Sequence, residues 1–580
     1  MAAPPDALPH QVKPITYLFP AADGARRAGS RSAELICGWS DACADRRTLA
    51  NMTDDSVRPA LVWFRDDLRT SDHAALAHAA EAGPAIGLYI AEELPPGETV
   101  TDEPGSPPLG PRPLGGAAKW WLHHSLHALA DRLAELGIEL IVAAGDPREI
   151  VPRIAAELDA VTVTWQRRYA PGSRALDAEI KASLPSASSH PGHLLNEPWE
   201  VATKQGHPYK VFTPFSRAAA DNLATAPDGG SAHQVPRLHG RAVSQDTLQA
   251  THAAIDALAL TPDHPSRPEP DWASEFHRYW TPGEKGAHAR LADFIGRLGE
   301  GPSPADRKAS AADLEYRYAT GRDYMALDAT SRLSPHLRFG EISPRQAWDA
   351  VAEAIETGDI TATDGESFLR QLLWRDFAWH RRYHLPNLDT TNTRTSFDAF
   401  PWAWFPDDLD APRAEAPEVR PGGSAGHEGE EAGVRAALSA WRSGVTGIGL
   451  VDAGMRELWA TGHMHNRVRM LAGSLLTKNL GVHWRHGEEW FWDTLVDADE
   501  ASNPFNWQWV AGCGDDAAPY FRIFNPETQA TRYDPTGAYI RRWVPEYGTP
   551  AHVAPIVDLR ESRAAALSAY ELVKNTNPRP

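Results

Sequence analysis

The sequence predicts an N-terminal α/β part with a doubly wound, Rossmann-like parallel sheet, followed by an all-α part. Between residues 58 and 195, short apolar runs alternate with segments of helical, 3.6-residue period. From 286 to 547 the period is helical throughout. The stretch between them, 196–285, is rich in Pro, Gly, His and Asp and is predicted to be an interdomain linker.

The α/β part has the pattern of buried parallel strands separated by amphipathic helices. Four apolar runs are short enough to be strands, and two longer segments place their apolar residues on one helical face. The predicted strands cover 61–64, 85–90, 140–143 and 161–165, and the predicted helices cover 74–82 and 119–136. No G-x-G-x-x-G motif follows the first strand and no P-loop motif occurs, so neither kind of nucleotide-phosphate site is expected here.

The all-α part contains several strong helix signals. Ser343 and Pro344 form an N-cap and N1 pair, which predicts a helix running through residue 354. Two further helices are predicted over 364–383 and 464–479 from their apolar period.

Three segments lack a clear period. Residues 1–57 are rich in Ala, Pro, Asp and Arg, and are expected to be a disordered leader or the result of a start codon assigned too early. The Gly/Glu/Pro-rich stretch 411–433 is expected to be a mobile insert in the all-α part. Residues 548–580 are expected to form a C-terminal tail.

The composition is that of an ordinary globular protein, with 42% hydrophobic and 23% charged residues. No apolar run approaches the roughly 20 residues of a membrane span, and no signal-peptide pattern opens the chain. Cys37 and Cys43 lie in the leader, so only Cys513 remains, which excludes a disulfide framework and predicts a cytoplasmic location. No Cys/His group has the usual zinc spacing, so no metal site is expected.

A formal net charge of −20 argues against a general nucleic-acid coat. A local basic face remains possible, because phosphate contacts act within a Debye length of roughly 8–10 Å. Basic residues do concentrate in two places, although solvated helix faces explain each cluster equally well. These clusters are Arg375, Arg381 and Arg382, and Arg467, Arg469 and Arg485.

Two predicted helices carry mixed polar faces. Gln371, Trp374, Arg375 and Ala378 share one face of the first helix. Asn466, Arg469, Met470 and Gly473 share one face of the second. Buried polar groups need partners, and glycine lets a planar ligand approach closely. Either a ligand pocket or polar contacts between helices would account for these faces.

Several blocks of the sequence resemble the signatures of photolyases and cryptochromes, most closely those of class I-type cyclobutane pyrimidine dimer photolyases. The similarity runs in order from about residue 59 to 547. The blocks are 61–69 (LVWFRDDLR), 197–199 (EPW), 209–215 (YKVFTPF), 330–343 (TSRLSPHLRFGEIS), 368–377 (FLRQLLWRDF), 464–470 (MHNRVRM), 506–512 (NWQWVAG) and 519–526 (PYFRIFNP).

The resemblance implies that the all-α part binds FAD in its reduced form, FADH⁻. Tyr318 and 330–334 would hold the pyrophosphate, Asp497 and Asp499 would contact the flavin and adenosine, and Arg469 would pair with Asp497. Asn503 would face the flavin N5 edge, where a neutral amide favours the reduced anion. The cofactor-binding residues implied are Tyr318, Thr330, Ser331, Arg332, Leu333, Ser334, Phe368, Arg375, Asn466, Arg469, Asp497, Ala498, Asp499 and Asn503.

The resemblance also implies damaged DNA as a partner, with a flipped-out pyrimidine dimer lying between Trp374 and Trp509. No membrane partner is expected, and the protein is expected to be a monomer. Arg322, Arg522 and Gln529 would contact phosphates. The residues implied for the DNA side are Arg322, Gln371, Trp374, Asn466, Arg467, Met470, Trp509, Arg522 and Gln529.

An electron-hopping chain that reduces the photoexcited flavin is implied as well. Trp507 and Trp484 match its first two members, and the third is Trp402 or Trp404, with Trp402 preferred. With Asn503 and Gln371, these tryptophans make up the implied catalytic set.

Three positions depart from the family pattern. Gln371 stands where many bacterial members have Glu, and its amide can still donate and accept hydrogen bonds. His463 replaces the Trp usual before Met-His-Asn. Gln166-Arg167 replaces the Asn-Glu of members with a folate antenna, which favours 8-hydroxy-deazaflavin over methenyltetrahydrofolate as a second chromophore.

The expected activity is therefore light-driven repair of cyclobutane pyrimidine dimers in DNA by electron transfer from excited FADH⁻. The pair Asn466-Arg467 argues against a (6-4) photoproduct enzyme, which usually has paired histidines there. One alternative is a cryptochrome-like FAD photoreceptor without repair activity, favoured by Gln371 and His463. The other is a two-domain binding protein without flavin.

Overall fold

The computed structural model describes most of the chain. The described residues are 58–95, 97–101, 105–225, 242–260, 272–300, 311–408, 428–516 and 521–576. By its internal contacts, Val57–Pro580 is one compact unit. The predicted leader 1–57 lies outside the described residues, as does the insert up to residue 427.

The α/β part is built on a five-stranded sheet of order β3-β2-β1-β4-β5, in which all paired strands are parallel. The strands are β1 Ala60–Phe64, β2 Ala85–Glu92, β3 Leu140–Gly145, β4 Thr162–Gln166 and β5 Ala187–His190. The central strand β1 is buried along its whole length, as expected for a parallel strand with helices on both faces. The four predicted strands are confirmed, whereas β5, a half-buried edge strand of sequence ASSH, has no apolar run to reveal it.

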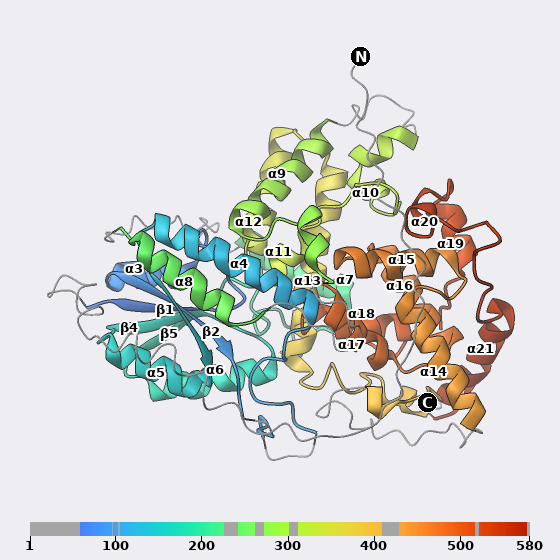
Figure 1. The fold of residues 1–580 in the computed structure, drawn as a ribbon, viewed down its shortest axis with the longest axis horizontal. Helices are drawn as coiled ribbons and strands as arrows, with labels where there is room; N and C mark the ends of the chain where they lie inside the picture. The colour runs from blue at the N-terminus through green and yellow to red at the C-terminus, as the bar shows by residue number, and fades with distance from the viewer. Residues whose placement is uncertain are drawn as a thin grey trace. The chain divides into compact units, whose positions relative to one another are not determined.

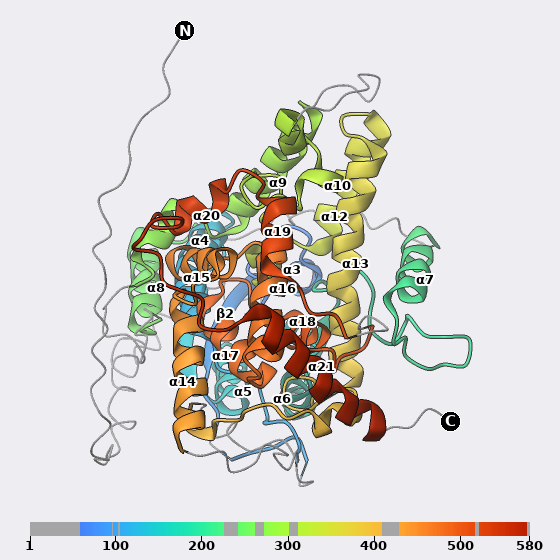
Figure 2. The same cartoon turned by 90° about the vertical axis from the view of Figure 1, so that its right-hand side faces the viewer.

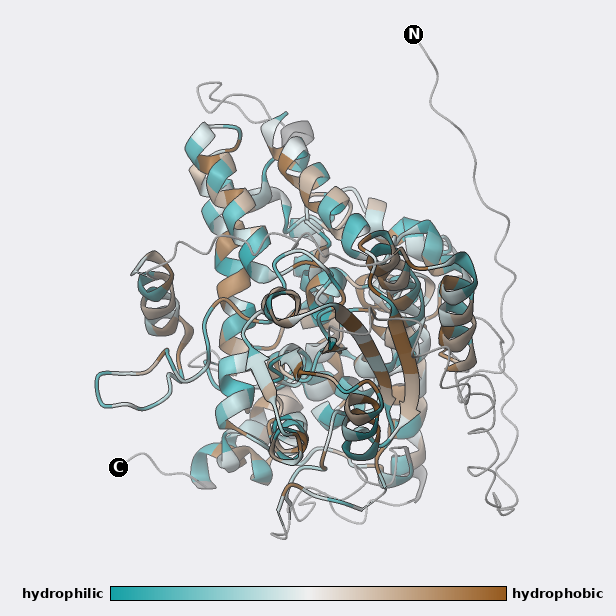
Figure 3. Cartoon of the chain, turned by 90° about the vertical axis from the view of Figure 1, so that its left-hand side faces the viewer, coloured by the Kyte–Doolittle hydropathy of each residue, from teal (hydrophilic) through white to brown (hydrophobic). Residues whose placement is uncertain are grey.

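Helices cover both faces of this sheet. They are α3 Ala74–Ala82, α4 Gly116–Glu135, α5 Pro147–Glu157 and α6 Pro171–Ser183. Figure 1 shows α4 above the sheet and α5 and α6 below it. Figure 3 shows two strongly apolar strands in the middle of this part, and the surrounding helices have both polar and apolar residues. The predicted doubly wound class is therefore confirmed.

The stretch 196–285, predicted as a linker, contains two helices. α7 Phe212–Thr225 packs against α13 Ala362–His384, and the two lie side by side in Figure 2. α8 Gln245–Ala257 packs on α4 and β3, and the Thr251 hydroxyl donates to the Leu140 carbonyl at 3.2 Å. Both helices bury only a narrow apolar stripe, which the surrounding Pro, Gly and polar residues conceal in the sequence.

The remaining elements form the helical part, and their ends follow local capping. Ser343 and Gln346 form a capping box at the start of α12, which ends at Gly358 with φ of 80°. The other elements of this part are η1 Ser274–Arg278, α9 Glu284–Gly299, η2 Ala311–Tyr316, α10 Tyr318–Gly321, α11 Ser334–Arg338, α12 Pro344–Thr357, η3 Thr395–Ala399, η4 Pro406–Asp408, α14 Glu428–Ser443, α15 Gly449–Thr461, α16 Asn466–Ser474, the π-helix η6 Leu475–Asn479, α17 Trp484–Thr494, α18 Ser502–Ala511, α19 Pro526–Tyr533, α20 Ala538–Trp543 and α21 Leu559–Thr576.

Three predicted boundaries of the helical part need correction. The insert 411–433 does not extend to 433, because α14 begins at 428 and is supported by an ion pair between Glu431 and Arg435. The helix predicted over 464–479 begins at 466, where the His465 side chain caps it, and continues as a π-helix after 474. The C-terminal tail includes the helix α21 (Figure 2). Tyr570 of α21 stacks on Phe521 with ring centroids 4.6 Å apart.

A buried carboxylate joins the α/β part to the helical part. Glu341 Oε1 accepts hydrogen bonds from Trp121 Nε1 of α4 at 2.9 Å and from the backbone N–H of Gly283 at 2.7 Å. Glu341 Oε2 is bonded to His336 Nδ1 of α11. The Glu341 side chain is fully buried, so its loss would leave buried donors without an acceptor.

Replacing this carboxylate should destabilise the protein in a way that depends on shape and hydrogen bonding. We expect Glu341→Leu to lower the free energy of unfolding by about 3 kcal/mol, because a buried polar network loses its acceptor. Glu341→Gln keeps an accepting oxygen and should lose clearly less. Urea unfolding followed by circular dichroism measures both, and equal losses for the two variants would contradict the role given to the acceptor.

Candidate functional site

A partly buried ion pair joins α16 to the loop after α17, next to the start of α11. Both guanidinium Nη atoms of Arg469 contact the carboxylate of Asp497, at 3.0 and 2.9 Å. The Ser334 hydroxyl donates to the same carboxylate at 2.6 Å. Burial by itself would raise the pKa of Asp497, but Arg469 brings it below its ordinary value, so the carboxylate stays charged. The pairing of Arg469 with Asp497, expected from the sequence, is present.

The neighbouring residues surround this pair with hydroxyl and backbone groups. Arg338 Nε donates to the Ala498 carbonyl at 2.9 Å, and Asp499 accepts the backbone N–H of Ala501 at 2.8 Å. Ser331 Oγ accepts from the Leu333 N–H at 3.4 Å, which leaves the serine hydroxyl hydrogen for another acceptor.

Other predicted cofactor residues lie around the same segment. Arg332 has a φ of 51°, the left-handed region that side chains other than glycine rarely adopt. The Thr330 carbonyl accepts from Arg297 Nη2 at 3.3 Å. Tyr318 and Phe368 pack edge to face at 5.8 Å. The Arg375 guanidinium donates hydrogen bonds to two backbone carbonyls, from Nη1 to His193 at 2.6 Å and from Nη2 to Leu337 at 3.2 Å.

Asn503 is buried at the start of α18, and its amide is oriented by a carboxylate. Asn503 Nδ2 donates to Glu488 Oε1 at 2.8 Å and to the Glu488 carbonyl at 3.0 Å. Glu488 is in turn held by Arg112 of the α/β part, at 2.6 and 3.1 Å. No local pattern in the sequence marks Glu488 or Arg112, because the two residues are 376 positions apart in the chain.

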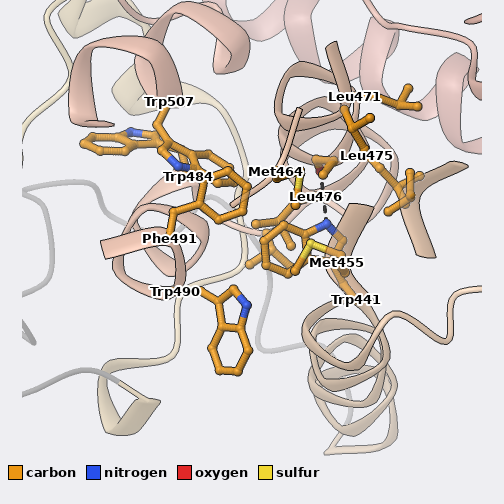
Figure 4. Packing of buried hydrophobic residues seen from close by; sticks show 14 of the residues in the cluster. Trp441, Met455, Met464, Leu471, Leu475, Leu476, Trp484, Trp490, Phe491 and Trp507 are labelled. Atoms are coloured by element: carbon orange, nitrogen blue, oxygen red, sulfur yellow. Dashed lines mark hydrogen bonds between the residues drawn. The ribbon is translucent and has the colours of Figure 1, made fainter. Parts of the chain in front are cut away.

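Trp507 lies on the buried side of α18 (Figure 4). A Cβ on Gly487 of α17 would come within 2.1 Å of its ring, so only glycine lets the indole approach α17 this closely. The Trp507 Nε1–H is buried and finds no acceptor among the described residues. The rings of Phe491 and Trp441 pack against Trp507, with centroids 4.9 and 6.2 Å from the Trp507 ring.

Trp484 and Trp402 of the expected electron chain belong to the same buried cluster, whereas Trp404 is half-buried. Trp484 is fully buried, and its Nε1 donates to Asn392 Oδ1 at 2.8 Å. The His483 ring lies 5.5 Å from that of Trp484, 5.1 Å from Trp402 and 5.2 Å from Trp404. Trp402 and Trp404 are therefore both near Trp484, and the choice between them stays a prediction.

The two aromatic residues predicted to flank a base differ in their contacts. Trp374 stacks on Phe212 of α7 with ring centroids 3.5 Å apart and planes 6° apart. Trp509 donates from Nε1 to the Asp516 carbonyl at 3.0 Å. Both indoles are half-buried. Gln371, also half-buried, donates to the Ser367 carbonyl at 3.2 Å, one turn earlier in α13.

The polar residues predicted to contact DNA differ in their surroundings. Arg467 forms a two-pronged ion pair with Asp323 at 3.0 and 2.6 Å, so its charge is already balanced. Asn466 is exposed, and its Nδ2 lies 4.0 Å from the Met470 sulfur. The three predicted phosphate contacts come from separate elements. The Arg322 guanidinium lies over the Tyr318 ring, 5.4 Å from its centroid, Arg522 is exposed in the segment before α19, and Gln529 is half-buried on α19.

The chemistry of these groups fits a flavin dinucleotide. The hydroxyls of Thr330 and Ser331 suit a pyrophosphate, and the Arg469–Asp497 pair supplies charged groups beside it. Asn503 offers a neutral amide, and Trp507 offers an indole N–H without an acceptor among the described residues. These groups come from the segment before α11, from α16, from α18 and from the loop between α17 and α18.

Comparisons with known proteins match both parts of the chain. Residues 60–236 match the family model described as DNA photolyase, and residues 368–552 match the FAD binding domain of DNA photolyase. No helix in the described part of the chain has the length and apolar character needed to span a bilayer.

Two curated relatives and one solved structure cover nearly the whole chain. A deoxyribodipyrimidine photo-lyase of Agrobacterium fabrum is 38% identical, over 89% of this chain and 98% of its own. One of Thermus thermophilus is 34% identical, over 87% and 96%. The crystal structure of a bacterial class III photolyase from Agrobacterium tumefaciens is 38% identical, with a TM-score of 0.72 over 90% and 99%.

That solved structure belongs to a class III protein, so this comparison does not favour the class I resemblance expected from the motifs. The FAD-binding domain expected in the all-α part is confirmed. Given the identity, the coverage and both family matches, this chain belongs to the photolyase/cryptochrome family.

Proposed function

We propose that this protein is a deoxyribodipyrimidine photo-lyase that uses light to split cyclobutane pyrimidine dimers in DNA. One observation carries the proposal: helix α18 bears Asn503, Trp507 and Trp509 within three turns. Asn503 and Trp507 are buried, whereas Trp509 is half-exposed. One short helix thus offers groups suited to a flavin on its inner side and an aromatic surface suited to a base on its outer side.

Reduced FAD, when bound, supplies the electron that opens the cyclobutane ring under light and then takes it back. The chain supplies the surroundings. Glu488 accepts both bonds from Asn503 Nδ2 and so turns the amide oxygen away from itself, toward the side where the flavin N5 edge would lie. An amide oxygen there accepts the N5–H bond of a reduced flavin and brings no acidic proton of its own.

The residues of the DNA side would bind an extruded dimer. The Phe212 ring stacks on one face of the Trp374 indole. The opposite face of the indole would then stack on a base. Gln371 can donate to and accept from the polar edge of a pyrimidine. The charge of Arg467 is neutralised by its ion pair with Asp323. We therefore propose that Arg467 orients the neighbouring residues of the DNA side and does not neutralise a phosphate.

An 8-hydroxy-deazaflavin antenna remains the preferred second chromophore over methenyltetrahydrofolate. Gln166 and Arg167, which replace the folate-type pair, line a surface hollow with Arg65, Arg168 and Tyr169 at the carboxyl end of β4. Ligands of doubly wound sheets bind at this edge. We further propose that the protein acts as a monomer on damaged DNA in the cytoplasm, in keeping with the free, buried Cys513.

A repair assay tests the function directly. The pure protein, chemically reduced in the dark, is mixed with an oligonucleotide containing one thymine dimer and then illuminated with blue light. We expect dimers to disappear in the light and to persist in the dark. Tight flavin binding without repair would identify a cryptochrome-like receptor, and absence of flavin after reconstitution would contradict the cofactor.

Stacking on Trp374 should contribute much of the affinity for the lesion. We expect Trp374→Ala to weaken binding of dimer-containing DNA about 10- to 100-fold, as loss of one base–aromatic stack implies. Trp374→Phe should recover part of the loss, and Trp199→Ala, which removes an indole that is 48% exposed, should leave affinity unchanged. Equal binding by Trp374→Ala and the unaltered protein in a gel-shift titration would exclude the stacking role.

Trp507 should serve the light-driven reduction of the bound flavin but not repair itself. We expect Trp507→Phe to slow the loss of oxidised-flavin absorbance under blue light at least about 10-fold, because phenylalanine is much harder to oxidise. Repair by protein reduced with dithionite should persist. Trp441→Phe is the matched control, since Trp441 is a buried neighbour outside the proposed chain. Unchanged photoreduction in Trp507→Phe would remove this residue from the chain.

A further inference from the structure

Helices α4 and α8 lie side by side on the outside of the α/β part and bring a group of histidines and carboxylates together (Figure 1). Each helix contributes two of them one turn apart. His123 and His127 lie on α4, and His252 and Asp256 lie on α8. Residues four apart share one face of a helix, so the two pairs face each other.

Three of these side chains place one ligand atom each around a common point. His127 Nε2 lies 3.1 Å from Asp256 Oδ1, and His123 Nε2 lies 3.8 Å from the same oxygen. All three atoms lie within 4.8 Å of one another. Zinc with bonds of about 2.0–2.1 Å in tetrahedral geometry separates its ligands by about 3.3 Å, so the group needs only small rotations to enclose an ion.

If both imidazole rings are neutral, the hydrogen bonds behind His127 assign its Nε2 no proton. His252 Nε2 donates to Asp131 Oδ1 at 2.9 Å, so in the neutral ring His252 Nδ1 is an acceptor. His127 Nδ1 lies 2.6 Å from that atom and therefore donates to it. The lone pair of a neutral His127 Nε2 then points at the Asp256 carboxylate 3.1 Å away, and either a proton or a metal ion between them would remove the repulsion.

The second histidine is suited to metal binding as well. His123 Nε2 faces the Asp256 carboxylate, and His123 Nδ1 is buried with no hydrogen-bond partner among the described residues. The Asp256 side chain is 64% exposed, so the site is open to solvent and a water molecule could complete a tetrahedron.

We propose that His123, His127 and Asp256 form a binding site for a divalent transition metal of the zinc class. In this site His252 and Asp131 hold His127 in the correct tautomer, an outer-shell role that often accompanies metal-bound histidines. A bound ion would link α8 to α4, the helix that packs on the sheet. In the sequence, α8 lies in the stretch between the α/β part and the helical part. The site shares no residue with the proposed flavin or DNA site, so it stands independently of the repair activity.

Metal titration of the whole protein tests the proposal. The protein is freed of metal with a chelator and titrated with Co²⁺, whose visible absorption is strong in a tetrahedral site, and Zn²⁺ is then added in competition. We expect one Co²⁺ to bind with tetrahedral bands, and Zn²⁺ to displace it. Zn²⁺ should also raise the melting temperature, because it binds only the folded state.

Graded variants locate the site. His127→Gln and Asp256→Asn should weaken Co²⁺ binding at least about 100-fold, and His252→Gln should weaken it about 10- to 100-fold through the outer shell. His207→Gln, at an exposed histidine away from these helices, should bind as the unaltered protein does. The tetrahedral bands and the Zn²⁺-dependent rise in melting temperature should vanish together in His127→Gln. Equal binding by His127→Gln and the unaltered protein, or the absence of tetrahedral bands, would overturn the proposal.

Discussion

The arrangement of the site depends on one buried carboxylate, Glu488 of α17. Its side chain is fully buried, and such a charge persists only when it is paired and hydrogen-bonded. Arg112 supplies the opposite charge from the loop before α4, and its guanidinium also lies over the Trp492 ring at 3.9 Å. Asn503 Nδ2 supplies two further hydrogen bonds. The α/β part thus determines how an amide in the helical part is turned.

Glu341 has a similar role at a second point of the same interface. It too is fully buried, and it accepts hydrogen bonds from α4 and from the segment before α9. Apolar packing alone would allow the two parts to slide, since it is not directional. Two buried carboxylates with several donors each define one relative position, because any displacement leaves a buried polar group without its partner. This precision matters for a site whose groups come from four separate elements.

The helical part combines a rigid core with a polar inner wall. Trp507 lies against Gly487, and Trp441 is anchored by a hydrogen bond from its Nε1 to the Ala472 carbonyl at 3.0 Å (Figure 4). Against this core, α16 presents Arg469 and α18 presents Asn503. Aromatic residues dominate the cluster, which suits both close packing and the hopping of electrons between indoles. On the opposite side, Trp374 and Trp509 are only half-buried and so remain accessible to a ligand.

Local patterns in the sequence were sufficient for the parallel sheet, the N-cap of α12 and the signature blocks around the site. These features depend on residues close together in the sequence, because apolar periodicity and helix capping are local signals. Local patterns could not reveal β5, whose four residues carry no apolar run, or α7 and α8, whose apolar stripes are narrow. Nor could they reveal the bond between Glu488 and Asn503 or the histidines and carboxylates shared by α4 and α8. Such contacts join residues far apart in the chain, and only the packing of one helix on another decides which of them meet.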